Sequence, residues 1–146
     1  MLYIALIAAI AMTGGCGDPD IFSLTGKVTL DGKPYERLIV YFDPIGRKVD
    51  AFHFGVGETD AEGNLTLRSS AGPGLAAGKY RVSFNCLIQE KASPNPAVGL
   101  SDKDESINAV VPVELVPEPY NDRRKSPVEF TIRKADNVFE YDIPGK

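Results

Sequence analysis

The sequence is poor in the side chains on which most enzymes and nucleic-acid-binding proteins depend. Of its 146 residues none is tryptophan, one is histidine and two are cysteine. The 16 Lys and Arg are outnumbered by 20 Asp and Glu, which gives a net charge of -4. Because nucleic acids bind to surplus positive charge, this balance argues against a nucleic-acid partner. The single His53 leaves few acid–base or metal-binding arrangements, so we expect no catalytic residue, cofactor or metal site.

Charge is missing altogether from the first 15 residues. Residues 2–12 form an uninterrupted apolar run of eleven, whereas a helix needs about 20 residues to cross a bilayer. A run of this length followed by small residues is typical of a secretory signal peptide. We therefore interpret residues 1–15 as a signal peptide, although the usual Lys or Arg before the apolar run is absent.

The four residues Thr13, Gly14, Gly15 and Cys16 resemble the bacterial lipobox, in which small residues precede a cysteine that is lipidated and becomes the N-terminus. Thr13 stands where that pattern usually has Leu. The resemblance implies lipidation at Cys16, with residues 16–22 forming the lipidated cysteine and a tether. Each buried CH₂ of the acyl chains would contribute about 0.8 kcal/mol to membrane anchoring. The alternative is an ordinary secretory signal, in which Cys16 is incidental.

The second cysteine is expected to be buried. If Cys16 carries lipid, Cys86 is left without a partner, and an unpaired cysteine in an exported protein is either buried or reactive. Cys86 shares strand parity with Tyr80, Val82 and Phe84, which favours burial. A disulfide between Cys16 and Cys86 is the alternative.

The rest of the chain alternates between apolar and polar residues in short segments, with turn signals about every ten residues. This pattern predicts an all-β fold, with strands near residues 24–30, 37–44, 53–59, 64–68, 79–88, 109–116, 128–133 and 139–143. Turns are expected at Asp31-Gly32 and at residues 60–64. Seven to eight strands indicate one two-sheet, immunoglobulin-like or transthyretin-like sandwich over residues 23–146. Residues 89–108, which have little apolar content, are predicted to form a long exposed loop.

Four stretches carry a family likeness: TGKVTLDGKPYERLIVYFDP, GETDAEGNLTL, AAGKYRVSF and VPEPYNDRRKSPVEFTIRKADNVFEYDIP. Together they resemble the small transthyretin-like or carboxypeptidase-regulatory-like β-sandwich lipoproteins of planctomycete bacteria. The resemblance implies a place in the cell envelope and no catalysis, and it implies no ligand.

Two activities of similar domains can be compared with the residues. Transthyretin-fold hydrolases use several His and Arg and end in Tyr-Arg-Gly-Ser, whereas this chain has one His and ends in Ile-Pro-Gly-Lys. Collagen-adhesin type B domains carry a Lys–Asn isopeptide bond, for which Lys27 and Asn137 are the imaginable partners. Lys27 falls on the polar face of its strand, which disfavours that bond.

Three further groups of residues have a functional and a structural interpretation. His53 lies between two phenylalanines, and a structural histidine is favoured over a catalytic one. Residues 60–64 echo the start of a calcium loop but lack its later ligands, so a hairpin turn is favoured. The acidic cluster of Asp102, Asp104 and Glu105 could bind calcium weakly, but a solvated loop is favoured, since Lys103 lies among these residues.

The remaining charged group is basic. Residues 123–125, Arg-Arg-Lys, could touch anionic headgroups, at about 1 kcal/mol for each charge.

These observations lead to one functional hypothesis. We expect a non-enzymatic, exported protein, lipid-anchored to the cell-envelope membrane, that acts as a structural or interaction module with an envelope protein or glycan as partner. The alternative is a secreted carbohydrate-binding or adhesin-type domain. A transthyretin-fold hydrolase is a third, disfavoured, possibility.

Overall fold

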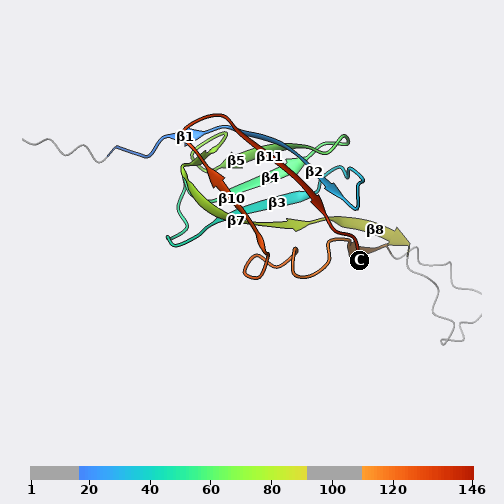
Figure 1. Ribbon diagram of the computed structural model, residues 1–146. Coiled ribbons are helices and arrows are strands. Elements are labelled where there is room, and N and C mark those ends of the chain that lie inside the picture. Colours follow the sequence, from blue (N-terminus) through green and yellow to red (C-terminus); the bar gives the residue numbers. More distant parts are fainter. Residues whose placement is uncertain (1–16, 92–109) are drawn as a thin grey trace, which may run out of the picture.

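A computed structural model describes residues 17–91 and 110–146 (Figure 1). Its regular elements are all strands, which confirms the predicted all-β class. In chain order they are β1 (Ile21–Phe22), β2 (Leu24–Leu30), β3 (Ile39–Pro44), β4 (Gly55–Thr59), β5 (Asn64–Ser69), β6 (Leu75–Ala76), β7 (Gly78–Asn85), β8 (Leu87–Lys91), β9 (Val110–Glu114), β10 (Val128–Ile132) and β11 (Asn137–Ile143). In the described ranges no helix could span a membrane.

Seven strands form one continuous sheet in the order β10-β7-β3-β4-β5-β2-β11. Neighbouring strands are antiparallel except for β2 and β11, which run parallel. The sheet curls, and Figure 1 shows β11 crossing in front of its middle strands. The two edge strands, β10 and β11, are not paired with each other, so the sheet is nearly a barrel with one open seam.

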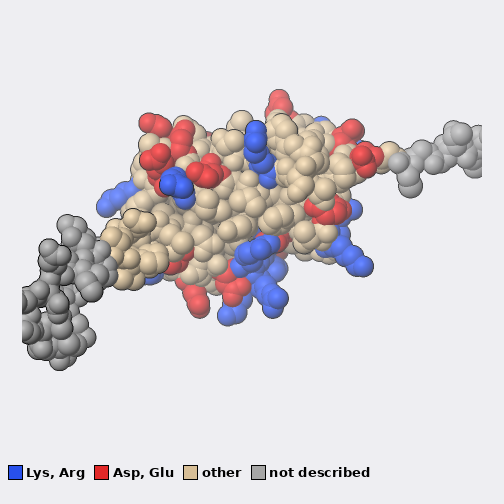
Figure 2. Space-filling view, turned by 180° about the vertical axis from the view of Figure 1, so that it is seen from behind, with Lys and Arg blue, Asp and Glu red and all other residues tan. Residues whose placement is uncertain are grey.

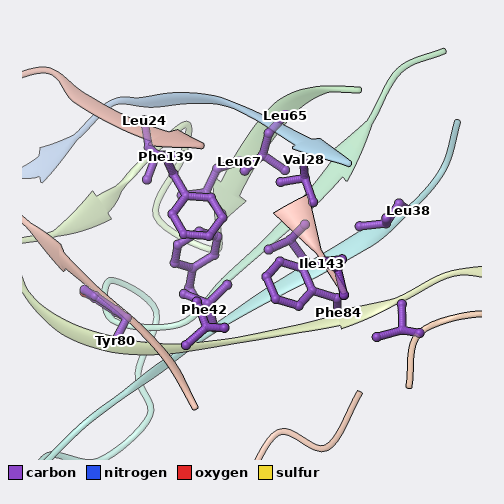
Figure 3. Close-up of a cluster of buried hydrophobic side chains, with 14 of the residues drawn as sticks. Leu24, Val28, Leu38, Phe42, Leu65, Leu67, Tyr80, Phe84, Phe139 and Ile143 are labelled. Atoms are coloured by element: carbon purple, nitrogen blue, oxygen red, sulfur yellow. The ribbon is translucent and has the colours of Figure 1, made fainter. Parts of the chain in front are cut away.

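The core lies inside the curl and follows the predicted alternation. Figure 3 shows side chains of β2, β5 and β11 meeting those of β3 and β7; the labelled ones from the first group include Leu24, Val28, Leu65, Leu67 and Phe139, and from the second Phe42, Tyr80 and Phe84. The ring centroid of Phe139 lies 5.5 Å from that of Phe42 and 5.2 Å from that of Phe130. Phe139 therefore joins the two sides of the core.

Cys86 is buried in this core at 2% exposure, as its strand parity predicted. Burial raises the pKa of its thiol, and the nearby Glu114 carboxylate raises it further. A buried thiol with a raised pKa is a poor nucleophile.

The predicted turn at Asp31-Gly32 is confirmed. Both residues have positive φ, at 52° and 72°, and Leu30 bridges to Lys33 across the turn. An aspartate and a glycine tolerate this conformation better than most residues, which explains why the pair marks the end of β2.

Several predicted boundaries are wrong: the strand expected at 37–44 begins at Ile39, and the one expected at 79–88 is divided into β7 and β8 at Cys86. The strand expected at 53–59 begins only at Gly55, because His53 belongs to a turn. The loop expected at 89–108 begins too early, since Gln89, Glu90 and Lys91 continue β8 and pair with β9. Residues 89–91 are polar and therefore lack the apolar alternation that marks a strand, whereas β9 lies within the strand expected at 109–116. Residues 92–108 lie outside the described part.

Candidate functional site

Cys16, the predicted lipidation site, lies outside the described residues, as do the predicted signal peptide and the acidic cluster at 102–105. The description begins at Gly17, and residues 17–20 are exposed. The chain then enters β1, which pairs with β6 through Ile21↔Ala76 and Phe22↔Leu75. Only four residues therefore separate Cys16 from the first paired strand, at one end of the molecule (Figure 1).

A pocket of about 520 Å³ lies at this end. It is formed by the tether and β1, the segment between β3 and β4, the residues at β6, and the turn between β10 and β11. Its lining residues are Asp18, Pro19, Asp20, Phe22, Arg47, His53, Ala76, Ala77 and Lys134. The positive charges of two lining residues, Arg47 and Lys134, offset the negative charges of Asp18 and Asp20. His53 is the remaining titratable lining residue.

His53 is held in this pocket by a carboxylate that the sequence analysis did not assign to it. The side chain is buried, and its Nδ1 donates to Asp50, at 2.7 Å from Oδ1 and 2.9 Å from Oδ2. Asp50 Oδ1 also accepts the backbone N–H groups of Phe52 and His53. The hydrogen bond from His53 is the main reason why the pKa of Asp50 is lower than usual.

The pair resembles half of a catalytic triad, in which a carboxylate orients a histidine. The lining residues described for this pocket include no serine, threonine or cysteine that could act as its nucleophile. The arrangement is that of a turn closed by a carboxylate, which agrees with the structural interpretation of His53. The spacing of three residues, Asp50 to His53, is the signal that could have found it.

The lowered pKa of Asp50 predicts how the stability of the protein depends on pH. A carboxyl group with a lower pKa in the folded state stabilises the fold above its unfolded pKa, and this contribution disappears as the pH falls through the folded value. We expect Asp50→Asn to be less stable than the wild type above about pH 4, with the difference shrinking below it. Urea unfolding of both proteins across this range measures the effect, and a difference that did not change with pH would contradict it.

Residues 60–64 form the predicted hairpin turn between β4 and β5. Asp60 Oδ1 accepts the backbone N–H groups of Glu62 and Asn64 at 3.0 and 2.8 Å, while Oδ2 accepts the Asn64 amide at 2.9 Å. Gly63 has a φ of 84°. These bonds, that of the Asn64 side chain above all, lower the pKa of Asp60. In the described ranges no three potential metal ligands lie together.

Two of the basic residues at 123–125 are paired with carboxylates, Arg123 with Asp43 and Lys125 with Asp122. The Arg123 guanidinium makes a two-bond ion pair with Asp43, with Nε at 2.9 Å from Oδ2. It also lies over the rings of Tyr41 and Phe54, at 5.1 and 5.0 Å from their centroids. Arg123 thus fastens the segment before β10 to β3, so its use as a headgroup contact, considered from the sequence, is not favoured.

This arginine should be hard to replace. Lysine keeps the charge but cannot make the planar two-bond contact with a carboxylate, so we expect Arg123→Lys to lower the free energy of unfolding by about 1 kcal/mol. The control is Lys125→Ala, which removes an exposed ion pair with Asp122 at 3.5 Å and should cost at most about 0.5 kcal/mol. If urea unfolding gave the same loss of unfolding free energy for both variants, the two-bond contact of Arg123 with Asp43 would be no more stabilising than an exposed ion pair.

Lys27 and Asn137 are not placed for an isopeptide bond. Lys27 lies opposite Glu140 in the β2–β11 ladder, three positions from Asn137, or about 10 Å along the strand. The Asn137 amide instead donates to the carbonyl of Ala135 at 2.7 Å and accepts the N–H of Arg133 at 2.9 Å. It closes the turn between β10 and β11.

A groove that the sequence did not predict runs along the open seam between β10 and β11. Two hollows of about 590 and 550 Å³ follow one another there and share Glu129, Phe130 and Val138. Val138 is 61% exposed although it is apolar. No alternation pattern indicates this groove, because it depends on which two strands become the sheet edges.

Comparisons with family models, curated proteins and solved structures find no match. On the face seen in Figure 2, acidic and basic side chains are interspersed. The short tether and the open seam are therefore the two features on which a function can be argued.

Proposed function

We propose that this protein is a non-catalytic, lipid-anchored module of the cell envelope, exported by residues 1–15 and attached through Cys16. The observation that carries the proposal is the uncharged apolar run ending in Thr13, Gly14, Gly15 and Cys16. The tether expected at 16–22 ends earlier, since Ile21 and Phe22 form β1. The four residues between Cys16 and β1 support the proposal, because β1 pairs with β6 directly after them and would hold the folded domain close to the membrane surface.

We propose further that the domain is a transthyretin-like sandwich, as the sequence resemblance implies. Two groups of strands, β10-β7-β3-β4 and β5-β2-β11, follow one another in the sheet order. Their inward side chains meet across the core, as Phe42 and Phe139 do. Such a two-layered core is the packing that a β-sandwich requires.

The role of an interaction module is supported by what the titratable groups do. The His53 ring is bound to Asp50, the Asp60 carboxylate closes a hairpin, and Arg123 is bound to Asp43. Each of these side chains makes a structural contact, and that contact explains its presence without a catalytic role.

Metabolic labelling with a palmitate analogue tests the anchor. The wild-type chain should be labelled and recovered with membranes, and Cys16→Ser should lose both properties. The matched control is Cys86→Ser, which should keep the label. An unlabelled, soluble wild-type protein would refute lipid anchoring and favour a secreted carbohydrate-binding or adhesin-type domain.

A further inference from the structure

Within residues 17–91 and 110–146, β10 and β11 are the two edges of the main sheet, and each has backbone groups without a strand partner on the side of the seam. On β7, the carbonyl of Lys79 accepts the N–H of Ile45, which continues β3. In an antiparallel ladder the bonding direction alternates, so Arg81 also faces β3 while Tyr80 and Val82 face β10. Their partners on β10 are Phe130 and Val128.

It follows that the intervening residues of β10, Glu129 and Thr131, direct their backbone N–H and C=O groups into the seam. On β11, the N–H of Asn137 donates to the carbonyl of Ser23 at the start of the β2 ladder. By the same alternation, Val138 and Glu140 direct their backbone groups away from β2 and into the seam. A sheet edge of this kind is a template for pairing with another strand.

The side chains around the seam define what could pair there. The inner side carries the rings of Phe130 and Phe139, and Phe130 is half-buried. In the half of the groove remote from the β10–β11 turn, the two charged lining residues are Glu129 and Glu140. Lys79 reaches Glu129 at 3.8 Å, but both side chains are about half exposed, and such pairs contribute little.

We propose that this groove binds an extended segment of a partner protein in which basic and apolar residues alternate. The segment adds as a strand to the free edges. Its apolar side chains cover Phe130 on the inner side, and its basic side chains meet Glu129 and Glu140 on the outer side, where these two residues are exposed. A second copy of this chain is disfavoured as the occupant. The chain carries a net charge of -4, and a second copy would bring its own Glu129 and Glu140 to the groove. The proposal rests on the proposed role as an interaction module, whose partner it identifies by chemistry.

A titration followed by NMR tests this proposal. The isotope-labelled full chain is held in detergent, and the added ligand is a blocked hexapeptide of alternating lysine and valine. Amide resonances of Glu129, Thr131, Val138 and Glu140 should shift, and the peptide should bind about tenfold more tightly than one of alternating glutamate and valine. Thr131→Pro removes an N–H that faces the seam and no bond to β7, so it should weaken binding by about tenfold.

Two further variants keep the test decisive if Thr131→Pro fails to fold. Glu129→Gln combined with Glu140→Gln should weaken binding by about tenfold, whereas Glu62→Gln, at the exposed β4–β5 turn, should leave it unchanged. Equal binding of the two peptides, or shifts confined to other strands, would overturn the proposal. So would a dimer in sedimentation that protects the same amides, since the occupant would then be a second copy. Peptide binding does not require acylation, so loss of the palmitate label would leave this result intact.

Discussion

Replacement of Gly26 by alanine is expected to lower the free energy of unfolding by about 3 kcal/mol. Gly26 lies in β2 opposite Phe139, where β11 pairs in parallel. A Cβ atom at Gly26 would lie 2.0 Å from the backbone oxygen of Phe139, so β11 would have to move away from β2. Because Phe139 joins both sides of the core, this movement would also loosen the contacts of its ring with Phe42 and Phe130.

Urea unfolding measures this effect, and Gly78→Ala is the matched control. Gly78 also lies in a strand of the main sheet, but a Cβ atom there would meet only the Tyr80 ring at an ordinary 3.7 Å. Removing a glycine restricts the unfolded chain and by itself stabilises a protein by up to about 1 kcal/mol. Gly78→Ala should therefore be neutral or stabilising. If Gly26→Ala were equally stable, the close approach of β11 to β2 would be wrong.

Truncation of Phe42 to alanine should cost about 3 to 5 kcal/mol. Phe42 is fully buried, and its ring makes edge contacts with Phe139 and Tyr80 at centroid distances of 5.5 and 6.5 Å. Its removal would leave a cavity in the middle of the core, which could close only if the surrounding strands moved. The free energy of unfolding of a typical domain is only about 5 to 15 kcal/mol, so this loss would be a large part of the total.

Thermal and urea unfolding would show this loss, with Phe42→Leu as an intermediate variant that remains folded and should lose less. Val49→Ala serves as the control, because Val49 is 62% exposed and such substitutions stay within about 0.5 kcal/mol. Equal stability of Phe42→Ala and Val49→Ala would contradict the central place of Phe42 in the core.

The strands and the core could be predicted from the sequence because alternation reports directly which side chains point inward. The parity of Tyr80, Val82, Phe84 and Cys86 is an example, and all four are buried. The turn at Asp31-Gly32 was also predictable, since these residue types tolerate positive φ. Alternation and turn residues are local features of the sequence, because each depends only on residues a few positions apart.

The candidate sites were harder to predict because they depend on contacts between distant segments. Arg123 lies 80 residues from Asp43, and nothing in the basic run at 123–125 indicates that pairing. The seam between β10 and β11 follows from the strand order, which alternation does not determine. Residues 89–91 of β8 were assigned to a loop for a third reason, since they are all polar and give no apolar alternation.

The identity of the mature N-terminus tests the central claim most directly. Mass spectrometry of the protein recovered from the membranes of the cells that produce it would measure the first residue and its modification. We predict a chain that begins at Cys16 and carries acyl groups on that residue. A chain that begins elsewhere, or one in which Cys16 has a free thiol or a disulfide to Cys86, would contradict lipid anchoring.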